Sequence, residues 1–247
     1  MIVKIEKIKK EISSVEEWYE LAAPKGEKKH WKVGRSAMEM AKFALSEHFS
    51  KFISDVTKQL EINENSYICE PEKKTYFAKG MGKGGPRQHD LLMIGENSVI
   101  GVEAKVSEHF DIQIKKKRRS GESDDNMNVR LNSCINYLYG EHVPDNVEDL
   151  YYQLLSATIG TILEAKRNKK KKAISLFITF VGNVEKEKDY HDKVEENRDA
   201  FITFCKSLGL DENGGQLSSI PGLEENQIEC WIKYVEIQLG STYEYKV

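Results

Sequence analysis

The chain contains 247 residues, of which 37 are Lys or Arg and 40 are Asp or Glu, so its formal net charge is -3. Hydrophobic residues make up 39% and charged residues 31%, which excludes an integral membrane protein, a wholly disordered chain and a strongly basic DNA-packaging protein. No repeat, low-complexity tract or Pro/Gly/Ser-rich linker divides the sequence. We therefore expect a single domain over residues 1–247.

No segment of the sequence resembles a targeting signal or a membrane span. The first ten residues include four lysines and lack the apolar core of a signal peptide. No later run approaches the roughly 18 apolar residues that cross a bilayer. The four cysteines lie far apart without a CxxC pair, which favours reduced, mostly buried thiols. We expect a cytoplasmic protein that has no membrane partner.

The first half of the chain is predicted to be helical at its start and β-rich after that. Residues 14–22 open with a Ser-x-x-Glu capping box and stop before Pro24, a pattern typical of a short helix. Apolar residues recur at three- and four-residue steps from Ala37 to Leu60 and predict one long helix. Short β-prone segments follow at residues 66–69, 75–78, 88–94 and 98–106.

The second half is predicted to alternate helices with single strands. Residues 108–147 are polar and charged, and indicate an insertion with a helix over residues 129–139. The patterns then predict a helix at 147–166, a strand at 173–181, a helix at 188–208 that ends at Gly209, and a strand at 227–239. The predicted order is helix, three strands, helix, strand, then helix and strand, which indicates an α/β fold.

The small net charge conceals an uneven distribution. Residues 184–247 carry 7 basic and 14 acidic residues, net -7, so residues 1–183 are net +4. The basic residues also form two blocks, Lys115–Arg119 and Lys166–Lys172. Such blocks are expected on a surface that binds a polyanion, and the alternative is a pair of solvated loops.

A hairpin over residues 88–106 contains the residues best suited to chemistry. Two apolar runs flank the turn-rich tetrapeptide Gly95-Glu-Asn-Ser98. In a symmetric turn the numbers of paired residues sum to 193, so Asp90 lies opposite Glu103, and Lys105 shares their face. Val102, Ala104 and Val106 then point to the other, apolar face of the sheet.

Two opposed carboxylates repel each other unless a cation lies between them. Mg²⁺ is the natural ion, because it is bound by one or two carboxylates, water and substrate phosphate. A lysine beside the ion can hold the attacking water and neutralise charge on phosphorus. The arrangement therefore predicts metal-assisted hydrolysis of a phosphodiester.

Asp90, twelve intervening residues and then Glu103-x-Lys105 resemble the motif of the PD-(D/E)xK phosphodiesterase superfamily. The resemblance implies a Mg²⁺-dependent nuclease, in which Mn²⁺ can substitute for Mg²⁺. It also implies that Asp90 and Glu103 ligate the metal, that the Ala104 carbonyl adds a ligand, and that Lys105 assists the nucleophile. His89 stands where the family has proline, a residue without a direct chemical task.

The resemblance also implies a restriction-endonuclease-like αβββαβ core, an α/β fold with a mixed central sheet flanked by helices. The predicted helices and strands place this core at residues 35–183, with the insertion at 108–147. Residues 1–34 then form an N-terminal helical extension, and residues 184–247 a C-terminal helix and strand.

Further site residues are suggested by their predicted positions in the core. The family often adds an acid from the helix before the strands, which makes Glu39 or Glu47 a candidate, although Ser36 and Glu39 also fit a capping box. His48 lies in the apolar stripe of that helix, where a packed histidine is the alternative to a catalytic one. Gln153 lies near the start of the helix predicted at 147–166, where the family often has a polar residue that orients the lysine, the water or a base; the alternative is an exposed helix position.

Five basic residues are candidates for contacts with nucleic acid. Lys83 and Arg87 belong to a glycine-rich segment before the catalytic strand, which lacks the P-loop order of residues. Arg118, Arg119 and Lys170 belong to the two basic blocks and would bind phosphates without reading sequence. We expect DNA as the partner in preference to RNA, and a homodimer if both strands are cut.

Two other classes of function remain open from the sequence. The chain could be a nucleic-acid-binding module that keeps this fold without cutting. It could also be an interaction protein that uses its acidic C-terminal part as the contact surface. Salt-dependent binding without cleavage would indicate the first class, and absence of such binding the second.

Overall fold

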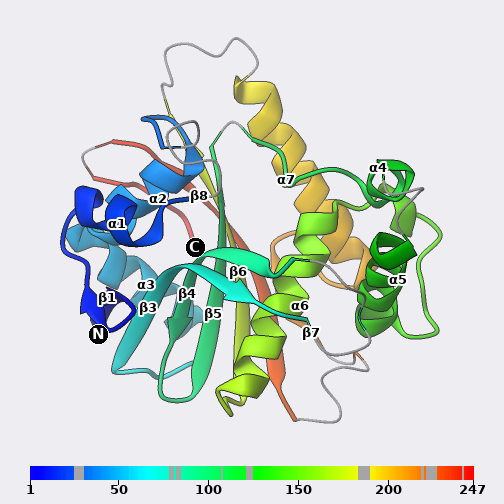
Figure 1. Cartoon of the computed structure of the whole chain (residues 1–247), viewed down its shortest axis with the longest axis horizontal. Helices are drawn as coiled ribbons and strands as arrows, with labels where there is room; N and C mark the ends of the chain where they lie inside the picture. The colour runs from blue at the N-terminus through cyan, green and yellow to red at the C-terminus, as the bar shows by residue number, and fades with distance from the viewer. Residues whose placement is uncertain are drawn as a thin grey trace.

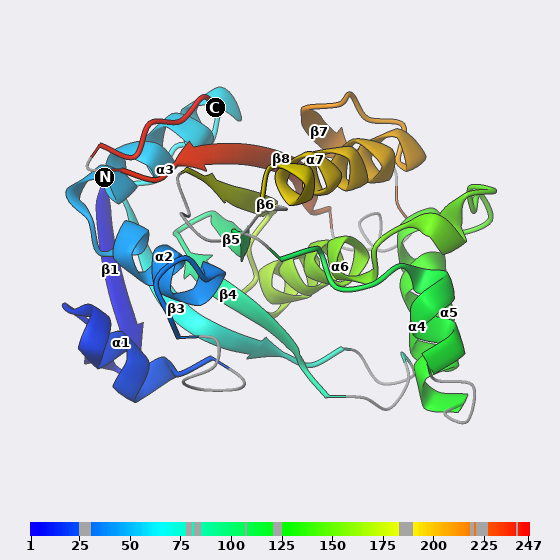
Figure 2. The same cartoon turned by 90° about the horizontal axis from the view of Figure 1, so that it is seen from above.

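Eight strands form one mixed sheet in the order β2-β1-β3-β4-β5-β6-β8-β7. The computed structural model describes residues 1–24, 31–77, 81, 85–106, 108–120, 125–182, 190–217, 220, 227–240 and 242–247. Helices cover both faces of the sheet (Figures 1 and 2). The prediction of an α/β fold with a mixed central sheet flanked by helices is confirmed at this level.

The helices and strands alternate along most of the chain. In chain order they are β1 (Ile2–Lys7), β2 (Lys10–Glu11), α1 (Val15–Ala22), α2 (Ser36–Ala44), α3 (Glu47–Gln59), β3 (Ser66–Thr75), β4 (Arg87–Ile94), β5 (Ser98–Lys105), α4 (Ile114–Ser120), α5 (Asp125–Tyr139), the short 3₁₀ helix η2 (Val147–Asp149), α6 (Tyr152–Arg167), β6 (Lys172–Val181), α7 (Tyr190–Ser207), β7 (Gly214–Leu217) and β8 (Glu229–Gln238).

The sheet separates two apolar clusters, one under each layer of helices. Residues of α1, α2 and α3 pack on one face, where the predicted inward residues Val102, Ala104 and Val106 are fully buried. Residues of α4, α5, α6 and α7 pack on the other face, around Phe177. β5 and β6 are parallel, as are β6 and β8, so the chain crosses between them through helices, as parallel pairing requires.

The first predicted helix is confirmed, with one difference in its cap. The hydroxyl of Ser14 accepts a hydrogen bond from the backbone N–H of Glu17 at 3.1 Å. The carboxylate of Glu17 accepts from the backbone N–H of Ser13, at 2.8 Å, in place of the N–H of Ser14. The prediction that residues 1–34 are a helical extension is wrong in part, because β1 precedes this helix and pairs in parallel with β3.

The prediction of one long helix over residues 37–60 is wrong, because the chain breaks it into α2 and α3 at Leu45 and Ser46. Ser46 has an extended backbone, and its hydroxyl donates to the carbonyl oxygen of Phe43 at 2.7 Å. A serine competes in this way with helical hydrogen bonds. The change of direction brings the rings of Phe49 and Phe52 within 5.3 and 5.2 Å of the ring of Phe43.

Several strand and helix boundaries also differ from the predictions. The segment predicted at 66–69 continues to Thr75 as one strand, β3, and of the segment predicted at 75–78 only Thr75 belongs to it. Tyr76 and Phe77 lie outside the strand, and residue 78 lies outside the described residues. The strand β7 was not predicted. The helix expected from residue 147 starts at Tyr152, after a 3₁₀ turn. The insertion at 108–147 contributes to the hydrophobic core, because Phe110, Leu131 and Leu138 are buried.

The last helix and both later strands are confirmed. β6 and β8 lie within one or two residues of the predicted ranges, and α7 ends before Gly209, whose φ of +71° suits a glycine stop. The four cysteines are free and buried, as expected. Among the helices that the structure describes, none is both long enough and apolar enough to cross a membrane.

Candidate active site

The β4–β5 hairpin has the register that the sequence predicts. The paired residues run from Leu91 with Val102 to Ile94 with Val99, and the two numbers of each pair sum to 193. The ladder ends just before Asp90. There the Asp90 carboxylate, through Oδ2, accepts a hydrogen bond from the backbone N–H of Ala104 at 2.7 Å. Asp90 is therefore hydrogen-bonded to Ala104, the residue between Glu103 and Lys105.

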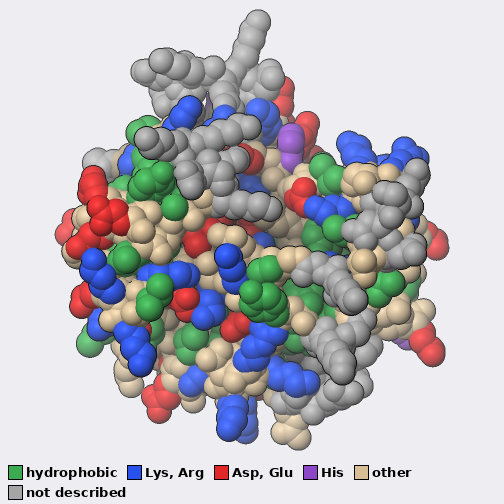
Figure 3. Space-filling view, viewed as in Figure 1, with side chains coloured by type: hydrophobic (Ala, Val, Ile, Leu, Met, Phe, Trp, Pro, Cys, Tyr) green, Lys and Arg blue, Asp and Glu red, His purple; other side chains and the backbone are tan. Residues whose placement is uncertain are grey.

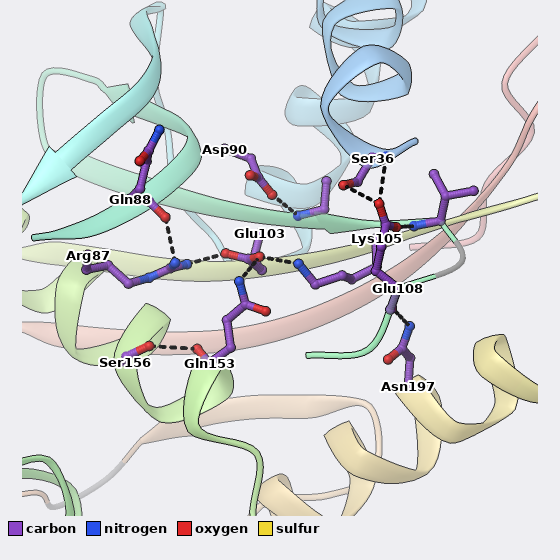
Figure 4. Close-up of polar contacts among 12 residues, drawn as sticks. Ser36, Arg87, Gln88, Asp90, Glu103, Lys105, Glu108, Gln153, Ser156 and Asn197 are labelled. Atoms are coloured by element: carbon purple, nitrogen blue, oxygen red, sulfur yellow. Dashed lines mark hydrogen bonds and ion pairs between the residues drawn. The ribbon is translucent and has the colours of Figure 1, made fainter. Parts of the chain in front are cut away.

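Glu103 is the centre of a buried hydrogen-bond network (Figure 4). Its Oε1 accepts from Lys105 Nζ at 2.5 Å and from the side-chain amide of Gln153. Its Oε2 accepts from a terminal nitrogen of Arg87. Glu103 is only 1% exposed and Lys105 only 7%. The structure thus brings together Asp90, Glu103, Lys105 and Gln153, four residues that the sequence predicted as catalytic.

Gln153 reaches Glu103 because α6 packs closely on β5. Gly101 of β5 and Gly160 of α6 leave room between the two elements, and a Cβ on Gly101 would lie 2.1 Å from the hydroxyl of Thr161. The ring of His89 fills the remaining space, fully buried, with both ring nitrogens unpaired among the described residues. Burial and the charge of Arg87 lower the pKa of His89, so its ring is neutral and serves packing.

Glu103 and Lys105 are held in their charged forms. Burial is the largest effect on Glu103 and favours the neutral acid, but the charges of Lys105 and Arg87 and their hydrogen bonds lower its pKa overall. Burial is also the largest effect on Lys105 and opposes its charge. The negative charges of Glu103 and Asp90 outweigh burial and raise the pKa of Lys105. The pair is therefore a carboxylate and an ammonium at neutral pH.

Asp90 has a different electrostatic environment. Burial, and after it the charge of Glu103, raises the pKa of Asp90 to about 7. Burial, and after it the charge of Asp90, raises the pKa of Glu72 to about 8. Each carboxylate is thus close to other negative charge without enough positive charge to balance it.

Sequence reasoning missed Glu72. On β3 it lies between Pro71, which pairs with Leu91, and Lys73, which pairs with His89, so the register places it beside Asp90. Its carboxylate accepts a hydrogen bond from the amide of Gln88, and its φ of +49° interrupts the regular strand. The signal was available, because paired residues of β3 and β4 have numbers that sum to 162, but it required β3 to be recognised as one strand.

The structure also places Glu108, another acid that the sequence did not single out, beside the site. Its carboxylate accepts hydrogen bonds from Ser36 at the start of α2 and from the backbone N–H of Val106, at 2.9 Å for the latter. Its backbone carbonyl accepts from Asn197 of α7 at 2.9 Å. Glu108 thus ties α2 and α7 to the end of β5 that carries Lys105.

The other candidate residues from the first helices lie outside this network. The carboxylate of Glu39 accepts from the N–H of Gly34 at 2.9 Å and pairs with Lys42. Glu39 therefore caps the start of α2, although the N-cap residue is Arg35 and not Ser36. The side chain of Glu39 is buried. Glu47 is exposed, and His48 lies 6.0 Å from the ring of Tyr243 near the C-terminus.

The five predicted nucleic-acid contacts occupy different environments. Arg87, expected to contact nucleic acid, is buried and hydrogen-bonded to Glu103. Arg118 forms an ion pair with Glu148 at 2.8 Å, and Arg119 is exposed on the same helix, α4. Lys83 lies outside the described residues.

Lys170 lies at the far end of the sheet from the site. Its Nζ donates to the carbonyl oxygen of Glu96 at the tip of the hairpin, at 2.8 Å. Next to it, Lys172 of β6 is level with Ser98 of β5, seven residues before Lys105. At about 3.3 Å per residue, the block Lys166–Lys172 is separated from Lys105 by about 23 Å along the strands.

The donor set of the site fits a divalent cation in part. Asp90 and Glu72 offer hard oxygen donors whose pKa values are raised by burial and, after it, by neighbouring negative charge. Glu103 would need to exchange one of its contacts with Arg87, Lys105 or Gln153 in order to bind a metal. Within the described residues, no group of three or more His, Cys, Asp and Glu is arranged as a complete metal site. Ala104 contributes its N–H to Asp90.

Comparison with known proteins identifies one family. A family model described as "Domain of unknown function (DUF6946)" matches residues 11–238. No curated protein and no solved structure matches the chain.

Proposed function

The chain belongs to the DUF6946 family, and from the geometry of its site we propose that it is a Mg²⁺-dependent nuclease of the PD-(D/E)xK type, acting on DNA. One observation carries the proposal. The carboxylate of Asp90 accepts a hydrogen bond from the backbone N–H of Ala104, the residue between Glu103 and Lys105. Glu103 and Lys105 form an ion pair with each other. Asp90 lies thirteen positions before Glu103, and Lys105 two positions after it, yet the three side chains lie side by side in the folded chain. The PD-(D/E)xK motif requires such an arrangement.

The order of elements supports the same proposal. Helices α2 and α3, strands β3, β4 and β5, helix α6 and strand β6 follow one another as in the αβββαβ core of restriction-endonuclease-like proteins. In the sheet, β3, β4, β5 and β6 are consecutive neighbours, with β5 and β6 parallel. The site residues lie on β4, on β5 and at the start of α6. The four buried free cysteines suit a reducing compartment such as the cytoplasm.

In this proposal Asp90 and Glu103 hold Mg²⁺, or Mn²⁺ in its place, with Glu72 beside Asp90 as a further oxygen donor. The bound ion would supply Lewis-acid polarisation of the phosphodiester and a lower pKa for a bound water. Lys105 donates hydrogen bonds to the attacking water or to a phosphate oxygen, because its ammonium group is charged and buried. Gln153 orients Glu103 from α6.

A specific observation also favours the non-cutting alternative. Both oxygens of Glu103 are already satisfied by Lys105, Gln153 and Arg87. An arginine in this position supplies the positive charge that a metal ion would otherwise provide. A chain in which Arg87 stays in place would bind nucleic acid without cutting it.

Cleavage assays separate the two functions. Purified protein is incubated with linear DNA, circular DNA and RNA in Mg²⁺, in Mn²⁺ and in EDTA. The nuclease proposal predicts cleavage of DNA with either metal and none in EDTA, and loss of cleavage in Asp90→Ala and Lys105→Ala with folding retained. Salt-dependent binding without cleavage in the wild type would instead indicate the binding module.

A further inference from the structure

A polar cavity of about 240 Å³ adjoins the candidate active site at the first turn of α6. Its walls come from the start of β4 and from α4, α5 and α6. Two residues of its lining, Arg87 and Gln153, are also those that hydrogen-bond to Glu103. These two side chains therefore connect the cavity lining directly to Glu103.

Arg130 contributes a buried positive charge to the cavity, and the described residues supply no carboxylate partner for it. It is 6% exposed, and its Nε and one terminal nitrogen donate to the hydroxyl of Tyr152 and the carbonyl oxygen of Gly85, both at 2.7 Å. Its guanidinium lies 4.2 Å from the centre of the Phe77 ring. These partners are all neutral, and no carboxylate among the described residues pairs with Arg130. A buried charge without a counter-charge is costly unless a ligand supplies one.

Arg87 adds an unused donor. It is 8% exposed, and its Nε is buried without a hydrogen-bond partner in the described part of the chain. Such atoms are uncommon in folded proteins, and a missing ligand is one physical explanation. Lys117 supplies a third cation. Its Nζ lies 4.9 Å from the centre of the Tyr152 ring and 2.5 Å from a carboxylate oxygen of Asp111, the one acid among the described residues of the lining.

We propose that this cavity binds a phosphate group of the nucleic-acid substrate, next to the phosphodiester that is cut. The inference rests on the proposed nuclease function and names a part of the substrate that the site recognises. Arginine guanidinium groups match phosphate oxygens in geometry and charge. The positive end of the α6 dipole also favours an anion here. The volume, below the usual range of about 300–1,000 Å³ for drug-sized ligands, suits a phosphate with part of its nucleotide.

Binding of thymidine 5′-monophosphate in EDTA, measured by calorimetry, tests the cavity without any metal or cleavage. We expect the monophosphate to bind the wild type and thymidine not to bind. Arg130→Gln and Lys117→Gln should each weaken binding about tenfold or more, since each removes charged hydrogen bonds. Lys117 is partly exposed, so its variant is expected to fold even if Arg130→Gln is unstable. Arg198→Gln on α7, where Arg198 pairs with Glu236, is the matched control.

Cleavage assays then distinguish two sources of the phosphate. If it is a terminal phosphate, linear DNA with 5′-phosphate ends is cut faster than DNA with 5′-hydroxyl ends, and Arg130→Gln removes the difference. If it is an internal phosphate, closed circular DNA is cut as fast as linear DNA, and Arg130→Gln slows both equally. Either pattern supports the proposal.

The proposal is overturned if the monophosphate binds no better than thymidine, or if both cavity variants bind it as the wild type does. A protein that binds the monophosphate but never cuts would contradict the nuclease function and leave the cavity assignment standing. A protein that cuts DNA while the cavity variants bind phosphate normally would contradict the cavity assignment alone.

Discussion

Among the site residues, the carboxylates differ in how well their charge is balanced. Glu103 has hydrogen bonds from Arg87, Lys105 and Gln153, whereas Asp90 has the N–H of Ala104 and Glu72 has the amide of Gln88. The pKa of Glu103 is accordingly lowered, and those of Asp90 and Glu72 are raised. A bound cation would therefore be stabilised most on the side of the site where Asp90 and Glu72 lie.

Gln153 is a positioning residue, because its side-chain amide donates a hydrogen bond to Glu103. Removing the amide tests this role. Replacing it with alanine removes a hydrogen bond that orients Glu103, and changes of this kind typically cost about 10- to 100-fold in activity or metal affinity. We expect Gln153→Ala to lower kcat for DNA cleavage within that range, and higher Mg²⁺ to restore part of it. Gln216→Ala on β7 serves as the control. Unchanged kinetics in Gln153→Ala would show that Glu103 is oriented without it.

Glu72 makes the stability of the metal-free protein depend on pH. Its pKa rises from 4.5 to about 8 on folding, so the folded protein binds more protons than the unfolded chain within that window. The contribution of Glu72 to stability therefore falls as pH rises from about 4.5 to about 8. In EDTA we expect Tm to fall less over this range in Glu72→Gln than in the wild type or in Glu229→Gln, an exposed control. Equal slopes in all three proteins would contradict the assignment.

The effect of added Mg²⁺ on Tm is a second test of the carboxylates Asp90 and Glu72. A ligand that binds only the folded state raises Tm, and a metal binds the ionised carboxylates best at high pH. We expect the rise in Tm with Mg²⁺ to be larger at pH 8 than at pH 5. The rise should be smaller in Glu72→Gln than in Glu229→Gln. A rise that is independent of pH would indicate that Mg²⁺ binds elsewhere.

Among the elements, the contact between α6 and β5 decides the geometry of the site. α6 carries Gln153, and β5 carries Glu103 and Lys105. Their close approach depends on Gly101, because a Cβ there would overlap the hydroxyl of Thr161. A larger residue at Gly101 must move α6 away from β5.

Gly101→Ala is therefore expected to destabilise the protein by about 1–3 kcal/mol, the usual cost of overpacking a core. Cleavage should fall more than stability alone explains, because Gln153 is carried away from Glu103. Gly240→Ala is the control, since a Cβ at Gly240 meets no heavy atom within 4 Å. Chemical denaturation and single-turnover cleavage of both variants provide the measurements. Wild-type stability and cleavage of Gly101→Ala would show that α6 and β5 have room for a methyl group between them.

The hairpin could be predicted because its signals are local, since a turn flanked by two apolar runs fixes the register that places Asp90 near Glu103. The helix that carries Gln153 could be predicted, but not its start, because a 3₁₀ turn at Val147–Asp149 precedes α6. The break at Ser46 could not be predicted, since the apolar stripe continues across it and the packing of Phe43 decides the bend. Burial of Arg87 was missed for a similar reason, because its partner Glu103 comes from another strand.

Over the whole molecule, the basic residues do not form one continuous surface. On the face seen in Figure 3, Lys and Arg side chains are interspersed with those of Asp and Glu. Of the two basic blocks, Lys115–Arg119 lies on α4 beside the cavity, through Lys117, whereas Lys166–Lys172 lies at the other end of the sheet. Only the first is placed to contact a nucleic acid whose phosphodiester is at Lys105.

Charge removal at the two ends of the sheet tests this distinction. Lys116→Gln with Arg119→Gln removes two exposed cations near the site, and Lys169→Gln with Lys171→Gln removes two exposed cations far from it. Each lost phosphate contact lowers the salt slope of DNA binding by about 0.9. We expect the first pair to lower affinity and slope, and the second pair to change neither. The opposite result would place the binding surface at the hairpin tip.

The proposed function requires that Asp90, Glu103 and Lys105 form a metal-dependent site for phosphodiester hydrolysis. It is tested by the Mg²⁺ dependence of DNA cleavage by the wild type and by Lys105→Met, prepared in parallel and matched in Tm. We predict fragments that appear with Mg²⁺, disappear in EDTA, and are absent for Lys105→Met at every Mg²⁺ concentration. Equal cleavage by the two proteins would contradict the claim, and so would cleavage by neither.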